Sequence, residues 1–354
     1  ERVTTVPAHP HFELNDVDRH FRAERLDPHL PQQLFDAHRH ITIPDHINED
    51  EITENHRNSW PFEVARFESI EETRFGYRQL FPGREVDFLA FGAPHMGCRY
   101  EQNNDYLADE LSGTDSAALA LVPPTWDTDR VLENLRKPNM IGIKVYQGMI
   151  PGFSGEDVRV FDFCTHEHLA LLNDLGGWLT LHLPRAERLA HPENIAEVLE
   201  IREKYPNIVL VIAHVGRAYP GRYAREGLPP LADDDGIYFD TSALLNPAVY
   251  AVALDRIGPQ RLLFGSDFPI LYMRGRRRWE GDKYINLTSG DYSWNTDREP
   301  PEVEATYTLY IYEAMAACIE MTLALGFGEA ELSAIFNDNA RSLIDKVLAR
   351  KESW

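Results

Sequence analysis

The sequence Leu-Phe-Asp-Ala-His-Arg-His occupies residues 34–40, where a short apolar run ends in polar side chains. Such a run is typical of a strand buried in a parallel sheet. Because side chains alternate between the two faces of a strand, His38 and His40 point the same way. Two imidazoles one pleat apart can reach a single ion, so the segment is compatible with a metal site at the carboxyl end of a strand, and by itself it is equally compatible with two structural histidines.

Seven further apolar segments follow along the chain. They occupy residues 86–91, 117–122, 140–146, 178–183, 208–215, 237–240 and 261–268. Helical patterns separate many of them, including residues 161–175, 193–204 and the stretch from Asn246-Pro247 to residue 257. Strand–helix alternation through eight strands predicts a closed (β/α)8 TIM barrel of the α/β class, with a doubly wound sheet as the alternative.

The expected barrel spans residues 34–354 and follows an N-terminal arm, residues 1–33, which is polar and weakly periodic. Three connections exceed the usual loop length, namely residues 41–85, 92–116 and 269–306 after strands 1, 2 and 8. In this fold the segments that leave the carboxyl ends of the strands build the active site. We therefore expect the metal site at that end of the barrel and functional residues in these loops.

The chain has 354 residues, of which 57 are acidic and 35 are Lys or Arg, giving a formal net charge of −22. This charge repels nucleic acid and anionic membrane surfaces, so neither is expected as a partner. An anionic substrate would need a local basic patch, and residues 274–278 carry four arginines. The three cysteines, Cys98, Cys164 and Cys318, are few and far apart, which favours the reducing cytoplasm. The expected partner is a small-molecule substrate, and a homo-oligomer is compatible with the sequence.

Three later strands also end in side chains that can bind a metal. The fifth predicted strand reaches His182, the sixth reaches His214 and the eighth reaches Asp267. Burial of an unpaired charge or imidazole is costly, so these groups should share partners. A divalent ion at the mouth of the barrel would satisfy all of them at once.

Several motifs together resemble the amidohydrolase superfamily. They are Asp36-Ala-His38-Arg-His40, His182 on strand 5, Ala213-His214-Val-Gly216 and Gly265-Ser266-Asp267-Phe-Pro269. More narrowly, the chain is similar to the amidohydrolase-related branch that includes aminocarboxymuconate semialdehyde decarboxylase, resorcylate-type decarboxylases and pyrone dicarboxylate lactonase. Residues 335–341 are similar to the closing helix of that branch, and the resemblance covers residues 34–345.

The resemblance implies a role for each site residue. His38, His40, His182 and Asp267 would bind one divalent ion, with zinc expected. Asp267 would also accept a proton from the attacking water, while His214 would polarise the substrate or shuttle a proton. Chemistry supports these roles, because a zinc ion activates water and a neighbouring carboxylate can pass its proton to the leaving group.

A two-metal site is the alternative to a single ion. Lys144 alternates with apolar residues in the fourth strand, so its side chain is expected to face the barrel interior. In two-metal amidohydrolases a lysine at this place is carboxylated and bridges the ions, and His182 and His214 would then hold the second ion. The branch that the chain most resembles is usually mononuclear, which favours one ion and leaves Lys144 to contact the substrate.

Four further residues are candidate substrate contacts. Tyr146 follows Lys144 on the same strand, and three arginines lie close in sequence to site histidines, namely Arg39, Arg185 and Arg217. The planar fork of an arginine binds carboxylates, although a structural ion pair would explain each arginine equally well.

These residues predict a metal-dependent hydrolase of a C–O or C–N bond next to a carbonyl, such as a lactone or amide, in a small carboxylated molecule. The alternative is a non-oxidative decarboxylase that uses the same metal site. A barrel with a vestigial site and a binding role is disfavoured by the intact ligand set.

Overall fold

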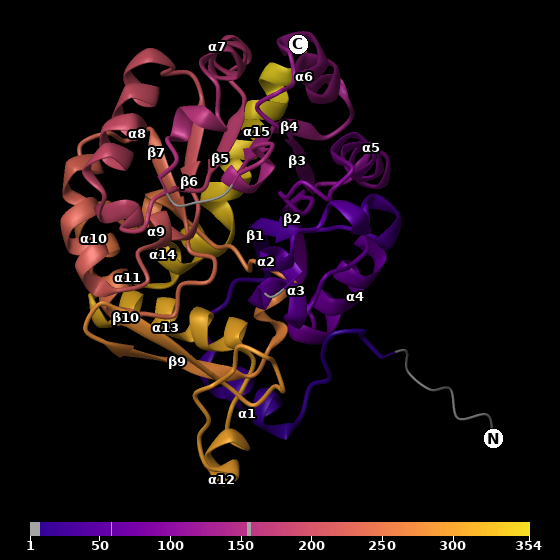
Figure 1. Ribbon diagram of the computed structural model, residues 1–354. Helices are drawn as coiled ribbons and strands as arrows, with labels where there is room; N and C mark the ends of the chain where they lie inside the picture. Colours follow the sequence, from indigo (N-terminus) through magenta and orange to yellow (C-terminus); the bar gives the residue numbers. More distant parts are fainter. Residues whose placement is uncertain (1–7, 58, 154–156) are drawn as a thin grey trace.

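A computed structural model describes residues 8–57, 59–153 and 157–354, and it contains eight parallel strands in the order β1 to β8 (Figure 1). Each strand pairs in parallel with the next along the chain. The strands are β1 Gln33–His40, β2 Glu85–Phe91, β3 Ala117–Leu121, β4 Met140–Val145, β5 Trp178–Leu181, β6 Val209–Ile212, β7 Ile237–Asp240 and β8 Leu262–Leu263. All eight predicted strands are present, and the (β/α)8 barrel is confirmed.

The helices alternate with the strands and surround them (Figure 1). They are α1 Asp16–Arg25, α2 Glu54–Arg57, α3 Trp60–Val64, α4 Ile70–Leu80, α5 Tyr100–Leu111, α6 Thr128–Arg136, α7 His166–Leu175, α8 Pro192–Lys204, α9 His214–Arg217, α10 Gly221–Gly227, α11 Pro247–Arg256, α12 Pro301–Glu304, α13 Tyr310–Ala324, α14 Glu329–Ser333 and α15 Asn339–Lys351. The predicted helix 161–175 begins only at His166, because the side chain of Thr165 accepts a hydrogen bond from the backbone of His168 and caps it there.

The barrel closes through an irregular segment rather than through a full eighth strand. The predicted strand 261–268 is reduced to two residues, and beyond it the backbone of Phe264, Asp267 and Phe268 bonds to β1 at 2.8–3.0 Å. Gly265 permits this approach, since a Cβ at that position would lie 2.9 Å from the Cβ of His38. The segment that carries Asp267 is therefore held directly against the strand that carries His38 and His40.

Two layers of apolar side chains form the core. One lies between the strands and the outer helices, and the other fills the barrel itself. The inner layer includes Phe35, Leu119, Ile141 and Trp178, and four residues of α15 join it. This packed interior positions the site at the ends of the strands, as is usual for the fold.

The N-terminal arm is more structured than the sequence predicts. Residues 16–25 form α1, which begins with a capping box between Asn15 and Asp18. Asp18 also accepts a hydrogen bond from Thr308 at 2.9 Å and pairs with Arg274, so α1 is tied to the loop after β8. Residues 1–7 of the predicted arm lie outside the described residues.

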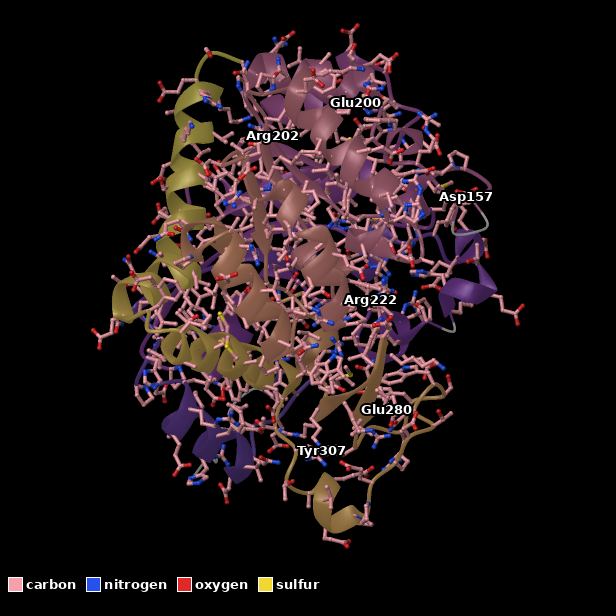
Figure 2. The ribbon with its side chains drawn as sticks, turned by 90° about the vertical axis from the view of Figure 1, so that its left-hand side faces the viewer. Asp157, Glu200, Arg202, Arg222, Glu280 and Tyr307 are labelled. Carbon is pink, nitrogen blue, oxygen red and sulfur yellow. The ribbon has the colours of Figure 1, made fainter. Side chains whose placement is uncertain are left out.

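The loop after β8 contains an antiparallel hairpin that the sequence did not predict. Its strands are β9 Gly275–Glu280 and β10 Lys283–Thr288. The neighbouring helix α10, on which Arg222 is labelled, lies next to this hairpin, on which Glu280 is labelled (Figure 2). The Nε of Arg222 donates to Asp282 at 2.6 Å and fixes the hairpin tip to the barrel.

Among the described helices, none is both long and apolar enough to cross a membrane.

Candidate metal centre

Three of the predicted ligands meet where β1 ends and the segment after β8 begins. The Nε2 atoms of His38 and His40 lie 3.5 and 3.4 Å from Oδ1 of Asp267. The two imidazole rings are on the same side of β1, with centroids 5.3 Å apart. One atom from each residue lies within 4.8 Å of the others, a spacing that a single ion can bridge.

A buried carboxylate that the sequence analysis missed orients His38. Asp240, the last residue of β7, lies 2.9 Å from Nδ1 of His38, and both side chains are fully buried. The Nε2 atom of His38 is thereby directed to the other ligands, and it has no hydrogen-bond partner among the described residues. A carboxylate behind a histidine is a common support for a metal ligand. The signal was present, since Asp240 ends an apolar strand as Asp267 does.

His40 is oriented by the backbone. Its Nδ1 donates to the carbonyl oxygen of Gly92 at 3.1 Å, which leaves Nε2 facing Asp267. Its ring also meets Phe91 edge to face at 4.8 Å, so the end of β2 supports the ligands on β1.

His182, which follows β5, and His214, which follows β6, line the same site. The ring of His214 lies 4.7 Å from that of His38, and the ring of His182 lies 5.3 Å from that of His214. His214, His38 and Asp240 form a second group whose ligand atoms lie within 4.8 Å. His182 belongs to neither close group, but its buried Nδ1 has no partner in the described part of the chain. Unpartnered buried nitrogens on two histidines fit a metal better than they fit an empty core.

The charge states suit a cation. Burial lowers the pKa of His38 to about 3, and it also lowers the pKa of His182 and His214. Burial alone would raise the pKa of Asp267, but His214 and a hydrogen bond from His40 outweigh it and lower that pKa. The site therefore offers neutral imidazoles beside an ionised carboxylate at neutral pH, which are the forms that bind metals.

Lys144 and Tyr146 face the site, as the strand alternation predicts. Lys144 is 1% exposed, and its Nζ lies 4.8 Å from the ring centroid of Phe91. Burial lowers the pKa of Lys144 to about 8, although Asp240 and Asp267 act in the opposite direction. The ring of Tyr146 meets that of His182 edge to face at 4.5 Å.

Two of the predicted substrate contacts lie elsewhere, and these expectations are corrected. Arg39 alternates with His38 and His40, so it points to the other face of β1, where it is fully buried and paired with Glu68. Arg185 is 6% exposed and bonds to Glu197 and Asn194 on α8. Both guanidinium groups are thus paired with carboxylates of the protein itself.

Arg217 remains beside the site. Burial is the main cause of the lowered pKa of His182, and the positive charge of Arg217 is the second cause. The Arg217 side chain donates a long hydrogen bond of 3.4 Å to the carbonyl of Leu183, and it forms no ion pair with a carboxylate of the described residues.

A second histidine pair near the mouth was not predicted. His56 on α2 and His95 in the loop after β2 have ring centroids 4.2 Å apart. Burial lowers the pKa of His95 to about 3, with smaller effects from His56, Arg66 and His40. Both residues lie in the long loops, residues 41–85 and 92–116, that were expected to hold functional residues. Their place in these loops was the only sequence pattern that pointed to them.

The sequence matches the model of the family described as "Amidohydrolase" over residues 35–346. No curated protein matches the chain. Among solved structures, an amidohydrolase of Burkholderia multivorans with bound zinc is 16% identical, with a TM-score of 0.57 over 88% of this chain and 99% of that chain. A probable 2-pyrone-4,6-dicarboxylic acid hydrolase of Acinetobacter baumannii, with citric acid bound, is 14% identical, with a TM-score of 0.55 over 88% and 99%.

A dihydroxybenzoic acid decarboxylase of Polaromonas sp. JS666, with bound manganese and the inhibitor 2-nitroresorcinol, is 16% identical, with a TM-score of 0.52 over 89% of this chain and 97% of that chain. At these identities the structures show a shared fold. The family match covers most of the chain and agrees with the cluster of His38, His40 and Asp267, and both support a divalent metal. The chain belongs to the amidohydrolase family.

Proposed function

We propose that the protein is a metal-dependent hydrolase of a C–O or C–N bond next to a carbonyl, in a lactone or amide of a small carboxylated molecule. The observation that carries the proposal is the buried Asp267 carboxylate, whose Oδ1 lies 3.5 and 3.4 Å from the Nε2 atoms of His38 and His40. The low pKa of Asp267 keeps it ionised, so it can accept a proton at neutral pH.

His38, His40, His182 and Asp267 would hold one divalent ion, with zinc expected. Such an ion polarises a carbonyl oxygen and lowers the pKa of water when it is bound. The alternative is a second ion held by a carboxylated Lys144 together with His182 and His214. The lowered pKa of Lys144 supports this alternative, because only the neutral amine can be carboxylated.

Asp267 takes the proton of the attacking water and returns it to the leaving alkoxide or amine. His214 lies next to this carboxylate, and its pKa is influenced by it. The hydroxyl of Ser242 donates to Asp240 and so accepts from Nδ1 of His214, at 2.8 Å. This leaves the lone pair of Nε2 of His214 to share the proton that Asp267 takes from water, and in this protonated form His214 would donate to the oxyanion of the tetrahedral intermediate.

Lys144, Tyr146 and Arg217 are the proposed substrate contacts. Lys144 and Tyr146 belong to the end of β4 and Arg217 follows β6, so they can hold different edges of a small molecule. Lys144 and Arg217 supply positive charge around the site, which a carboxylated substrate needs in a chain of net charge −22.

Non-oxidative decarboxylation is the second candidate. The name of the Polaromonas structure refers to this reaction, and its chain shares the fold over most of its length. In such a reaction, His214 would relay a proton from solvent water to the carbon atom that loses carbon dioxide.

The test is a screen of the protein, stripped of metal and reloaded with zinc or manganese, against lactones, amides and aromatic carboxylic acids. Release of acid without carbon dioxide supports the hydrolase, and Asp267→Asn should abolish it. Release of carbon dioxide would assign the decarboxylase instead. Equal turnover with and without metal would contradict both.

A further inference from the structure

The four arginines of residues 274–278 differ in their partners. Arg274 pairs with Asp18, Arg276 with Glu299 and Arg278 with Glu280. Arg277 pairs with no carboxylate among the described residues, although it is only 6% exposed. A buried guanidinium without a counter-ion is costly, so its partner is expected to come from outside the chain.

The fork of Arg277 is held in place by two neutral acceptors. Its Nε donates to the side chain of Asn286, its cross-strand neighbour on β10, at 2.9 Å. Its Nη1 donates to the carbonyl of Ala243 at 2.9 Å. The remaining nitrogen, Nη2, has no hydrogen-bond partner within the described ranges. Ala243 follows Ser242, which holds His214, so Arg277 reaches the end of β7 beside the metal centre.

Two more arginines gather around the same tyrosine. The guanidinium carbons of Arg277 and Arg188 lie 5.0 and 5.4 Å from the ring centroid of Tyr219. Arg217 is near enough to lower the pKa of Tyr219, against the larger effect of burial. The ring of Tyr219 lies 6.4 Å from that of His214, which connects this arginine cluster (Arg188, Arg217 and Arg277) with the site.

The hairpin is fixed over this cluster. The indole nitrogen of Trp279 donates to the carbonyl of Tyr219 at 3.0 Å, and the ring of Tyr284 meets that of Tyr219 edge to face at 5.2 Å. The three arginines come from connections after β5, β6 and β8, and all three leave the carboxyl ends of the strands. None of them forms an ion pair with a carboxylate in the described part of the chain.

We propose that the arginine cluster is a subsite for a carboxylate of the substrate that is remote from the bond being broken. The inference rests on the proposed function and deepens it. It assigns the carboxylate of the substrate to the side of the barrel mouth that the hairpin covers. Planar guanidinium forks match a carboxylate, and three unpaired cations create a local positive field within an acidic protein.

The experiment is calorimetric titration of the metal-free protein with isophthalate, with its neutral diamide and with inorganic phosphate. Isophthalate should bind, and the diamide should not. Arg277→Gln and Arg217→Gln should each weaken isophthalate binding, by about 30-fold or more for Arg277. Arg276→Gln, a neighbour on the same hairpin that is already paired with Glu299, should bind as the wild type does.

Equal binding of isophthalate and its diamide would overturn the proposal, as would unchanged binding in both Arg277→Gln and Arg217→Gln. Tighter binding of phosphate than of isophthalate would overturn the assignment to a carboxylate. Melting curves check that each variant is folded. Because binding is measured without metal and without turnover, a failed activity screen leaves this result intact, and the two proposals can fail separately.

Discussion

Nδ1 of His38 and Oδ2 of Asp240 are 2.9 Å apart in the barrel interior, although 202 positions separate the two residues in the sequence. Neither side chain is reached by solvent. Asp240 also accepts hydrogen bonds from the backbone of His214 at 2.9 Å and of Ser242 at 3.1 Å. One carboxylate at the end of β7 thus orients two histidines of the site.

Replacing Asp240 by Asn should weaken metal binding by about 10- to 100-fold, because His38 loses the carboxylate that fixes its tautomer and ring orientation. Competition with a chromogenic chelator measures the affinity. Asp233→Asn, at an exposed position in the connection that precedes β7, is the control and should leave the metal affinity unchanged. Wild-type affinity in Asp240→Asn would show that the pair does not support a metal ligand.

Zinc should stabilise the folded protein, since its proposed ligands come together only on folding. At a free concentration 100 times its Kd, the expected gain in the free energy of unfolding is about 2.7 kcal/mol. Thermal unfolding with and without chelator measures this gain. His40→Gln should lose most of it, while the exposed His20→Gln should retain it. The same gain in both variants would argue against His40 as a ligand.

His214→Ala distinguishes one ion from two. If the site holds a single ion, this variant should keep its metal and lose turnover by about 100-fold or more, because only proton transfer and oxyanion contact are removed. Elemental analysis alongside the rate measurement checks it. Loss of about half of the metal would instead support the two-metal site with carboxylated Lys144.

Glu68→Gln tests the buried pair behind β1. Burial raises the pKa of Glu68, but Arg39 and then His9 outweigh it, so the pKa lies below its ordinary value of 4.5. A lowered carboxyl pKa gives stability that is present above 4.5 and is lost as the pH falls through the folded value. At neutral pH the variant should lose about 3–5 kcal/mol in the free energy of unfolding.

The deficit of Glu68→Gln relative to the wild type should therefore shrink as the pH falls below 4.5. Urea unfolding at neutral and acidic pH gives the two differences. The exposed Glu71→Gln, on the adjacent helix, is the matched control and should show no such trend. A deficit that is constant with pH would mean that packing, and not the charge of Glu68, supports Arg39.

The sequence predicted the barrel because its strands are continuous apolar runs, and it predicted the cluster of His38, His40 and Asp267 because polar groups end those runs. The hairpin was missed since β9, Gly-Arg-Arg-Arg-Trp-Glu, has no apolar alternation and is fixed by contacts such as Trp279 with Tyr219. For Arg39 the alternation argued against the prediction, because His38 and His40 occupy the other face. Asp240 was visible as a strand end, but its role depends on a histidine that is distant in the sequence.

The closure of the barrel between β1 and the segment after β8 also sets an order of events during synthesis. The backbone bond from Asp267 to His38 joins the first strand of the barrel to the segment after the last strand. At ribosomal rates the chain between them takes roughly 10–50 seconds to make. During that time the first strand has its neighbour β2 but an open edge on the other side. An open edge is a template for pairing with other chains, and the full set of proposed metal ligands exists only after the last strand has emerged.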